Sequence, residues 1–208
     1  MNPLFARLAL SLIATVTGIA PAFAHHLMGG RTPTSFTEGI LSGLGHPVIG
    51  LDHFAAVVAI GCLAAAHRAG FVLALGFVLM MTAGVALHLH GTSVPGAEIM
   101  VAVSVIILGA IMLRGREIAT AGAIALFAAV GLIHGYALGE SIYGAEPTPL
   151  YAYLLGLAVI QSGIALAAMH IARFLAQRAS DVSPLRLVGA GIAGIGLAVL
   201  MQQVVPGA

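Results

Sequence analysis

The chain has 208 residues, of which 60% are hydrophobic and only 7% charged, and its formal net charge is +1. Soluble domains carry about 25% charged residues, so eight basic and seven acidic side chains cannot cover a water-soluble globule, which excludes a soluble enzyme. The absence of lysine and of any basic run excludes a nucleic-acid-binding protein. A single cysteine, Cys62, excludes a disulfide framework. We therefore expect an all-α, polytopic membrane protein.

The N-terminal segment, residues 1–24, has the layout of a cleavable signal peptide. It has a positive start at Arg7, a short apolar stretch, and an Ala-x-Ala cleavage site at residues 22–24. The alternative is a first transmembrane helix over residues 4–24. Cleavage would leave His25-His26 at the mature N-terminus, outside the cytoplasm, where the α-amine and imidazole of His25 could chelate a metal ion.

Apolar stretches separated by short polar breaks follow, and we expect residues 25–208 to form a single six-helix transmembrane domain. The segment 35–47 is too short and too rich in glycine to span, so it is expected as a short helix at, or dipping into, the membrane surface. The last span carries closely spaced glycines, which we interpret as close helix packing rather than a nucleotide-binding loop. The expected spans are 51–67, 70–90, 97–113, 118–138, 149–172 and 185–205.

The arginines predict the orientation of these spans. They fall in the first, third and fifth breaks or directly after them, whereas the second and fourth breaks contain none. By the positive-inside rule the arginine-bearing breaks are cytoplasmic. Both mature termini then lie on the opposite side, which for a bacterial inner membrane is the periplasm. Arg31, in the mature N-terminal segment, departs from this pattern. The arginines that set it are Arg68, Arg114, Arg116, Arg173, Arg178 and Arg186.

Most histidines and several carboxylates fall at the opposite, periplasmic ends of the predicted spans. Ionisable groups at membrane depth are costly and usually face a partner or a cavity. Each alone could be an interfacial hydrogen-bonding group, but five histidines and three carboxylates at one end favour a metal site. The eight residues are His46, Asp52, His53, His88, His90, Glu98, His134 and Glu140.

Two local patterns sharpen this prediction. Between His46 and His53, Pro47 and Gly50 disfavour one continuous helix, so the chain can turn and bring His46 back toward Asp52 and His53. One of the last two residues could then bind the metal while the other orients a neighbouring imidazole.

The second pattern runs from His134 to Glu140. A spacing of six residues places the two side chains on different faces of an ideal helix. We expect Gly135 and Gly139 to let the helix unwind, so that both groups turn inward.

These motifs, His-Pro-x-x-Gly-x-Asp-His and His-Gly-x-Ala-x-Gly-x-Glu, resemble those of the HupE/UreJ family of hydrogenase- and urease-associated membrane proteins, regarded as nickel permeases. The resemblance covers nearly the whole mature chain, although Ile133 stands where the family often has Phe. It implies metal recognition by His46, Asp52, His53, His134 and Glu140. His88, His90 and Glu98 are added from their place in the predicted topology.

Imidazole and carboxylate ligands suit Ni, Co, Zn, Fe and Cu(II), so the choice of nickel, with cobalt or zinc as alternatives, comes from the resemblance alone. The metal is the transported ion, and we expect no cofactor and no enzyme activity. The expected partners are the divalent ion and membrane lipids; nucleic acid is excluded. A homo-oligomer, and delivery of the ion to nickel-enzyme maturation proteins, stay open.

Three polar residues of the fifth span offer a route onward. Gln161 and Ser162 lie near its middle and His170 near its cytoplasmic end. They could pass the ion along, or serve only as hydrogen bonds between helices. Two rival functions also stay open, which are an intramembrane zinc-dependent hydrolase and a membrane metal sensor or chaperone that binds without transport.

Overall fold

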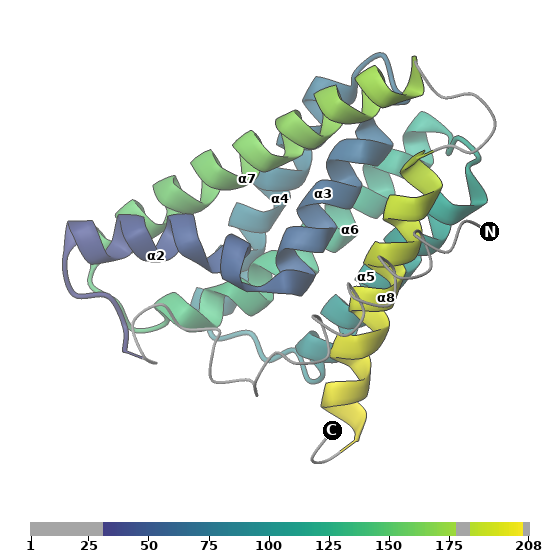
Figure 1. Cartoon of the computed structure of the whole chain (residues 1–208). Helices are drawn as coiled ribbons and strands as arrows, with labels where there is room; N and C mark the ends of the chain where they lie inside the picture. Colours follow the sequence, from purple (N-terminus) through teal and green to yellow (C-terminus); the bar gives the residue numbers. More distant parts are fainter. Residues whose placement is uncertain (1–30, 178–183, 206–208) are drawn as a thin grey trace, which may run out of the picture.

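A computed structural model describes residues 31–177 and 184–205, and the predicted signal peptide, its cleavage site and His25-His26 lie outside them. The described residues form helices joined by short connections and contain no strand (Figure 1). This confirms the all-α prediction for that part of the chain. In chain order the elements are α2 (Phe36–Ile49), α3 (Leu51–Ala64), α4 (Gly70–Leu89), α5 (Ala97–Arg114), α6 (Thr120–Gly139), the short η2 (Glu140–Ile142), α7 (Pro147–Ala176) and α8 (Pro184–Val204).

Five helices are long and apolar enough to cross a membrane, namely α4, α5, α6 together with η2, α7 and α8. The predicted span 51–67 is wrong as an independent span, because α3 ends at Ala64 after 14 residues. At 1.5 Å per residue it rises about 21 Å, short of the roughly 30 Å apolar core of a bilayer. Helix α3 is long and apolar enough to cross a membrane only when taken together with α2, as a pair bent by 78°. The chain is therefore a multi-pass membrane protein that includes one broken helix.

The break between α2 and α3 falls at Gly50 and not at Pro47. Ser35 is the N-cap of helix α2, and its side chain accepts a hydrogen bond from the Glu38 amide at 3.2 Å. The helix then runs through His46 and Pro47 to Ile49, so of the two residues predicted to disfavour a continuous helix, Gly50 breaks it and Pro47 does not. Gly50 leaves the helical region with φ −73° and ψ 101°. The expected turn after His46 thus exists, three residues after Pro47.

Helix α3 occupies the centre of the bundle. It packs against α7, α5, α8, α4, α2 and α6, and Figure 1 shows it enclosed between α7 on one side and α5 and α8 on the other. Small residues such as Ala56, Ala59 and Gly61 cover its surface and are fully buried or nearly so, which permits this close packing. Because α3 is central, Asp52 and His53 in its first turn are buried inside the protein, whereas Phe54 in the same turn is exposed.

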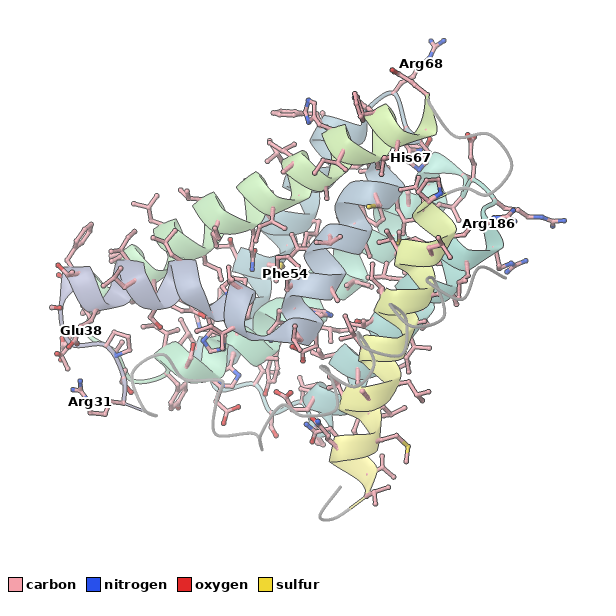
Figure 2. All side chains as sticks on the ribbon, in the orientation of Figure 1. Arg31, Glu38, Phe54, His67, Arg68 and Arg186 are labelled. Carbon is pink, nitrogen blue, oxygen red and sulfur yellow. The ribbon has the colours of Figure 1, made fainter. Side chains whose placement is uncertain are left out.

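Arg173 of α7 lies against the α3–α4 connection and Arg186 of α8 lies against Gly115 at the end of α5, so these arginines share one end of the bundle, as the predicted orientation requires. One pocket is lined by His67 of the α3–α4 connection, Arg116 of the α5–α6 connection and Leu185 in the first turn of α8. Figure 2 shows Arg68 and Arg186 at this end and Arg31 and Glu38 at the opposite end. We call the first the arginine end and the other, where α3 begins and α4 and α6 finish, the histidine end.

Glycines allow pairs of helices to approach closely. A side chain on Gly135 of α6 would collide with the Met81 backbone of α4, and one on Gly109 of α5 would collide with α8 near Ala193. In α8, Gly189 and Gly196 lie against α5, which confirms the packing interpretation for these two. The other two glycines of that run, Gly191 and Gly194, have no atom within 4 Å of such a side chain.

This packing predicts opposite outcomes for two glycine substitutions in α6. Gly135→Ala is expected to lower the free energy of unfolding by about 1–3 kcal/mol, because the new methyl group overlaps backbone that cannot move aside cheaply. Gly122→Ala faces open space and should leave stability unchanged or raise it slightly through higher helix propensity. Melting temperatures in the same detergent measure both. Equal melting temperatures for the two variants would contradict the α4–α6 packing.

Candidate functional site

A chain of three hydrogen-bonded side chains crosses the bundle near the histidine end. The Nδ1 atoms of His53 in α3 and His134 in α6 lie 2.9 Å apart. The Nε2 atom of His134 lies 2.8 Å from the Ser104 hydroxyl of α5. His134 is 0% exposed, and His53 and Ser104 are also buried. Three helices therefore place a polar chain inside an otherwise apolar bundle, where such groups are costly unless they serve a purpose.

The partners of this chain define where its protons lie. The Ser104 hydroxyl is 2.7 Å from the Val101 carbonyl oxygen, which can only accept, so its single proton points there. The hydroxyl oxygen consequently accepts from the Nε2–H of His134, and the Nδ1 of His134 carries a lone pair. His53 must then donate its Nδ1–H to His134. This assignment leaves the lone pair of His53 on Nε2, the arrangement in which a second imidazole orients a metal-binding histidine.

Asp52 adds a buried carboxylate at the same point. It stands in the first turn of α3 and is only 5% exposed, and its Oδ1 accepts a hydrogen bond of 2.8 Å from the His53 amide. The positive end of the α3 dipole stabilises a negative charge in that position. Asp52 is therefore placed to offset the charge of a cation bound by the adjacent His53.

His46 reaches the same region from α2. Its ring centre lies 6.4 Å from that of His53, with the rings inclined by 53°, and it is buried in the last turn of α2. Two imidazoles that share one metal ion at about 2.1 Å have ring centres roughly 5–6 Å apart. The bend at Gly50 thus brings His46 to within about an ångström of a shared-metal separation from His53, as the first motif predicts. We call His46, Asp52, His53 and His134 the buried histidine cluster.

His88 belongs to a separate aromatic group. Its ring packs against Tyr136, with centres 4.7 Å apart, and against Tyr143, at 5.7 Å. Its buried Nδ1 has no hydrogen-bond partner within residues 31–177 and 184–205. Tyr136 in turn donates to the Thr92 carbonyl at 2.8 Å. Tyr136 thus ties the connection after α4 to α6, and His88 packs beside it, outside the buried histidine cluster.

The remaining predicted ligands lie on the surface of the histidine end. His90, Glu98 and Glu140 are all exposed. The prediction that α6 unwinds to turn Glu140 inward is wrong, because α6 is continuous from His134 through Gly139. Its glycines serve packing instead, since a side chain on Gly139 would collide with His88. Of the eight predicted residues, four form the buried cluster and four lie outside it.

A metal site of three ligands is not preformed in the described part of the chain. No group of three His, Cys, Asp or Glu side chains within residues 31–177 and 184–205 is arranged to hold a metal ion. Both ring nitrogens of His134 are hydrogen-bonded, so the cluster would offer a metal the imidazoles of His46 and His53 and the Asp52 carboxylate, a set that small shifts, or a water ligand, would complete. That property fits an ion that must be bound and then released.

Gln161 lies deeper in the bundle, on α7. It is 0% exposed, and neither its Nε2 nor its Oε1 has a hydrogen-bond partner in the described residues. In the described residues Gln161 therefore does not form the hydrogen bond between helices that was one of its two interpretations. Ser162 is half-buried, and exposed His170 has its Nδ1 2.7 Å from the Leu166 carbonyl of its own helix.

Ser104 is the functional-site residue that the sequence argument overlooked. It is the sole hydroxyl side chain of α5, which is otherwise apolar apart from its two ends. A lone serine in the middle of a span was the available signal, since hydroxyl groups at that depth need a partner. Its partner, His134, lies on a different helix, so the pair could not be read from local spacing.

Fold and site together define a class, that of multi-pass α-helical membrane proteins with ionisable side chains buried at one end of the bundle. Comparison with known proteins narrows it, because the family model described as "HupE / UreJ protein" matches residues 12–199. The chain belongs to the HupE/UreJ family, as its motifs predict.

One relative is Protein HupE of Rhizobium leguminosarum bv. viciae, which is 31% identical over 131 residues. That alignment covers 62% of this chain and 66% of the relative, slightly less than two thirds of the relative's length. No solved structure matches the chain.

Proposed function

We propose that this protein is a permease that imports a divalent transition-metal ion, nickel in the first instance, from the periplasm to the cytoplasm. The observation that carries the proposal is the buried hydrogen-bonded chain from His53 through His134 to Ser104. A structural role alone would be met more cheaply by apolar side chains in a membrane. Membership of the HupE/UreJ family supports the same function.

Capture of the ion uses the chemistry of the buried histidine cluster. A hydrated cation arrives from the histidine end, where His90, Glu98 and Glu140 are exposed to it. His53 replaces a water ligand with its Nε2 lone pair, while its Nδ1–H bond to His134 keeps the ring oriented. The Asp52 carboxylate offsets part of the charge that the ion brings into the protein.

Gln161 marks the next step along the route. Gly61 of α3 packs against Ala165 of α7, and the two helices run in the same direction (Figure 1). Gln161, one turn before Ala165, is therefore about one turn, or roughly 6 Å, further from the histidine end than His53. A buried amide without a protein partner normally binds water or a ligand, and here it would meet a partly hydrated ion.

The membrane potential supplies the driving force for such a route. Moving one elementary charge across a membrane changes the free energy by about 2.3 kcal/mol per 100 mV. A divalent cation moving toward a negative cytoplasm gains twice that amount, so facilitated diffusion suffices for import.

Gln161→Leu tests the role of the unpartnered amide. Removing a buried polar group that lacks a partner should raise the free energy of unfolding by about 1 kcal/mol. We expect nickel uptake to fall several-fold in the same variant, because the ion loses a polar stop inside the bundle. The matched control is Ser162→Ala on the next, half-buried position, which should leave uptake near that of the wild type. A stabilised Gln161→Leu variant with full uptake would contradict the route.

The proposed function is tested by nickel uptake into cells that express the chain, compared with cells carrying an empty vector. We expect saturable uptake that excess cobalt or zinc reduces in proportion to its affinity for the site. Metal binding by the purified protein without cellular uptake would instead favour a sensor or chaperone.

A further inference from the structure

A second group of metal-binding side chains lies at the arginine end, far from the buried histidine cluster. The pocket described above at the arginine end is also lined by Cys62, Met112 and Glu117. Cys62 belongs to the last turn of α3, and Met112 to the last turn of α5. The pocket thus gathers a thiol, a thioether and the imidazole of His67 from separate elements.

His67 is the member of this group whose surroundings indicate a bound ligand. Its side chain is only 9% exposed, and its buried Nε2 has no hydrogen-bond partner in the described part of the chain. Its other nitrogen, Nδ1, lies 3.4 Å from the Thr120 hydroxyl. An imidazole nitrogen buried without a partner costs free energy that a bound ligand would offset.

The backbone of His67 is held in place by α7. Arg173 donates from Nη2 to the His67 carbonyl at 3.0 Å and from Nε to the Ala65 carbonyl at 3.2 Å. The His67 amide also donates to the Ala64 carbonyl at 3.0 Å. All six atoms in these three hydrogen bonds are backbone or guanidinium atoms, so the backbone of His67 is held beside the pocket and the residue is not a loose surface residue.

We propose that Cys62, His67 and Met112 form a second metal site, which receives the transported ion at the arginine end before its release. This proposal rests on the proposed transport function. Sulfur and imidazole together suit soft and borderline ions such as Ni²⁺, Co²⁺, Zn²⁺ and Cu⁺. The thiol gives up its proton to solvent as the metal–sulfur bond forms.

The two sites lie at opposite ends of the same central helix. Cys62 lies nine positions after His53 in α3, a rise of about 13.5 Å. The carboxylate and imidazole groups at the histidine end suit a partly hydrated ion. The sulfur ligands at the arginine end favour an ion that has lost its water. Ligand softness therefore increases along the proposed direction of import.

The single cysteine of the sequence makes this site directly observable. Co²⁺ is added to the full-length protein in detergent, and the near-ultraviolet thiolate-to-cobalt charge-transfer band is recorded. We expect this band in the wild type and in His53→Ala, because the sites are separate. It should vanish in Cys62→Ser, and in His67→Ala its half-saturating Co²⁺ concentration should rise by about tenfold or more.

Thr120→Val is the matched control for His67→Ala, since it removes the Nδ1 contact and leaves Nε2 untouched. Its band should match that of the wild type, and Met112→Leu, which preserves the volume of the side chain, should bind Co²⁺ more weakly. No band in the wild type, or a band unchanged by His67→Ala, would overturn the second site.

The test separates this proposal from the function on which it rests. Nickel uptake by cells without any charge-transfer band would leave the permease intact and remove the second site. A charge-transfer band without nickel uptake would keep the second metal site and remove its role in transport.

Discussion

Replacing His53 by alanine is expected to reduce nickel uptake by expressing cells to the level of the empty vector. The hydrogen bond to His134 sets the tautomer of His53 and leaves its lone pair on Nε2, and the His53 backbone amide binds the Asp52 carboxylate. Its loss removes a ligand and also leaves the buried Nδ1 of His134 without its donor. Uptake is measured at matched amounts of protein in the membrane fraction.

The control for this variant is His90→Ala. His90 lies at the same end of the bundle but is exposed at the end of α4. We expect its removal to change uptake by less than about twofold, since exposed side chains seldom hold a buried ion. Equal uptake by the wild type and His53→Ala, with His90→Ala unchanged, would show that the buried histidine cluster takes no part in transport.

Asp52→Asn is expected to produce the second largest loss, a reduction in uptake of about 10–100-fold at low nickel concentration. The amide keeps an oxygen that can accept from the His53 backbone, so the helix start is preserved. The negative charge is lost, and with it the group that offsets the charge of the cation in a medium of low dielectric constant. The effect should appear as a raised half-saturating nickel concentration.

Glu140→Gln is the matched control, because it removes the same charge from an exposed position at the same end. We expect it to alter uptake only slightly, and to do so less as salt screens the surface charges. A larger loss in Glu140→Gln than in Asp52→Asn would reverse the assignment and place the recognition site on the surface of the histidine end.

The sequence predicted that polar residues gather at one end of the bundle. Successive spans run in opposite directions, so the order of the spans indicates the end at which each polar residue lies. The predicted turn between His46 and His53 also exists, but the sequence assigned it to Pro47 as well as Gly50. Proline near the end of a helix removes only one backbone donor, and α2 tolerates that loss in its last turn. Glycine, which lacks a side chain, is where the chain bends.

Contacts between helices could not be predicted from spacing. Gly135 and Gly139 resemble sites of unwinding in the sequence, yet their use is decided by α4, whose backbone and His88 lie against them. The partnership of Ser104 with His134 depends in the same way on how α5 packs beside α6. The length of α3 was overestimated because apolar composition continues past Ala64, where the helix ends.

The most direct measurement of the central claim is radiolabelled nickel influx into proteoliposomes that contain only the purified wild-type protein and lipid. A membrane potential, negative inside, is imposed, and initial rates are compared with those of protein-free liposomes and of His53→Ala. Nickel import by the chain predicts saturable influx in the wild type and background rates in the other two. Nickel binding by the reconstituted wild type, without influx above the protein-free liposomes, would contradict it.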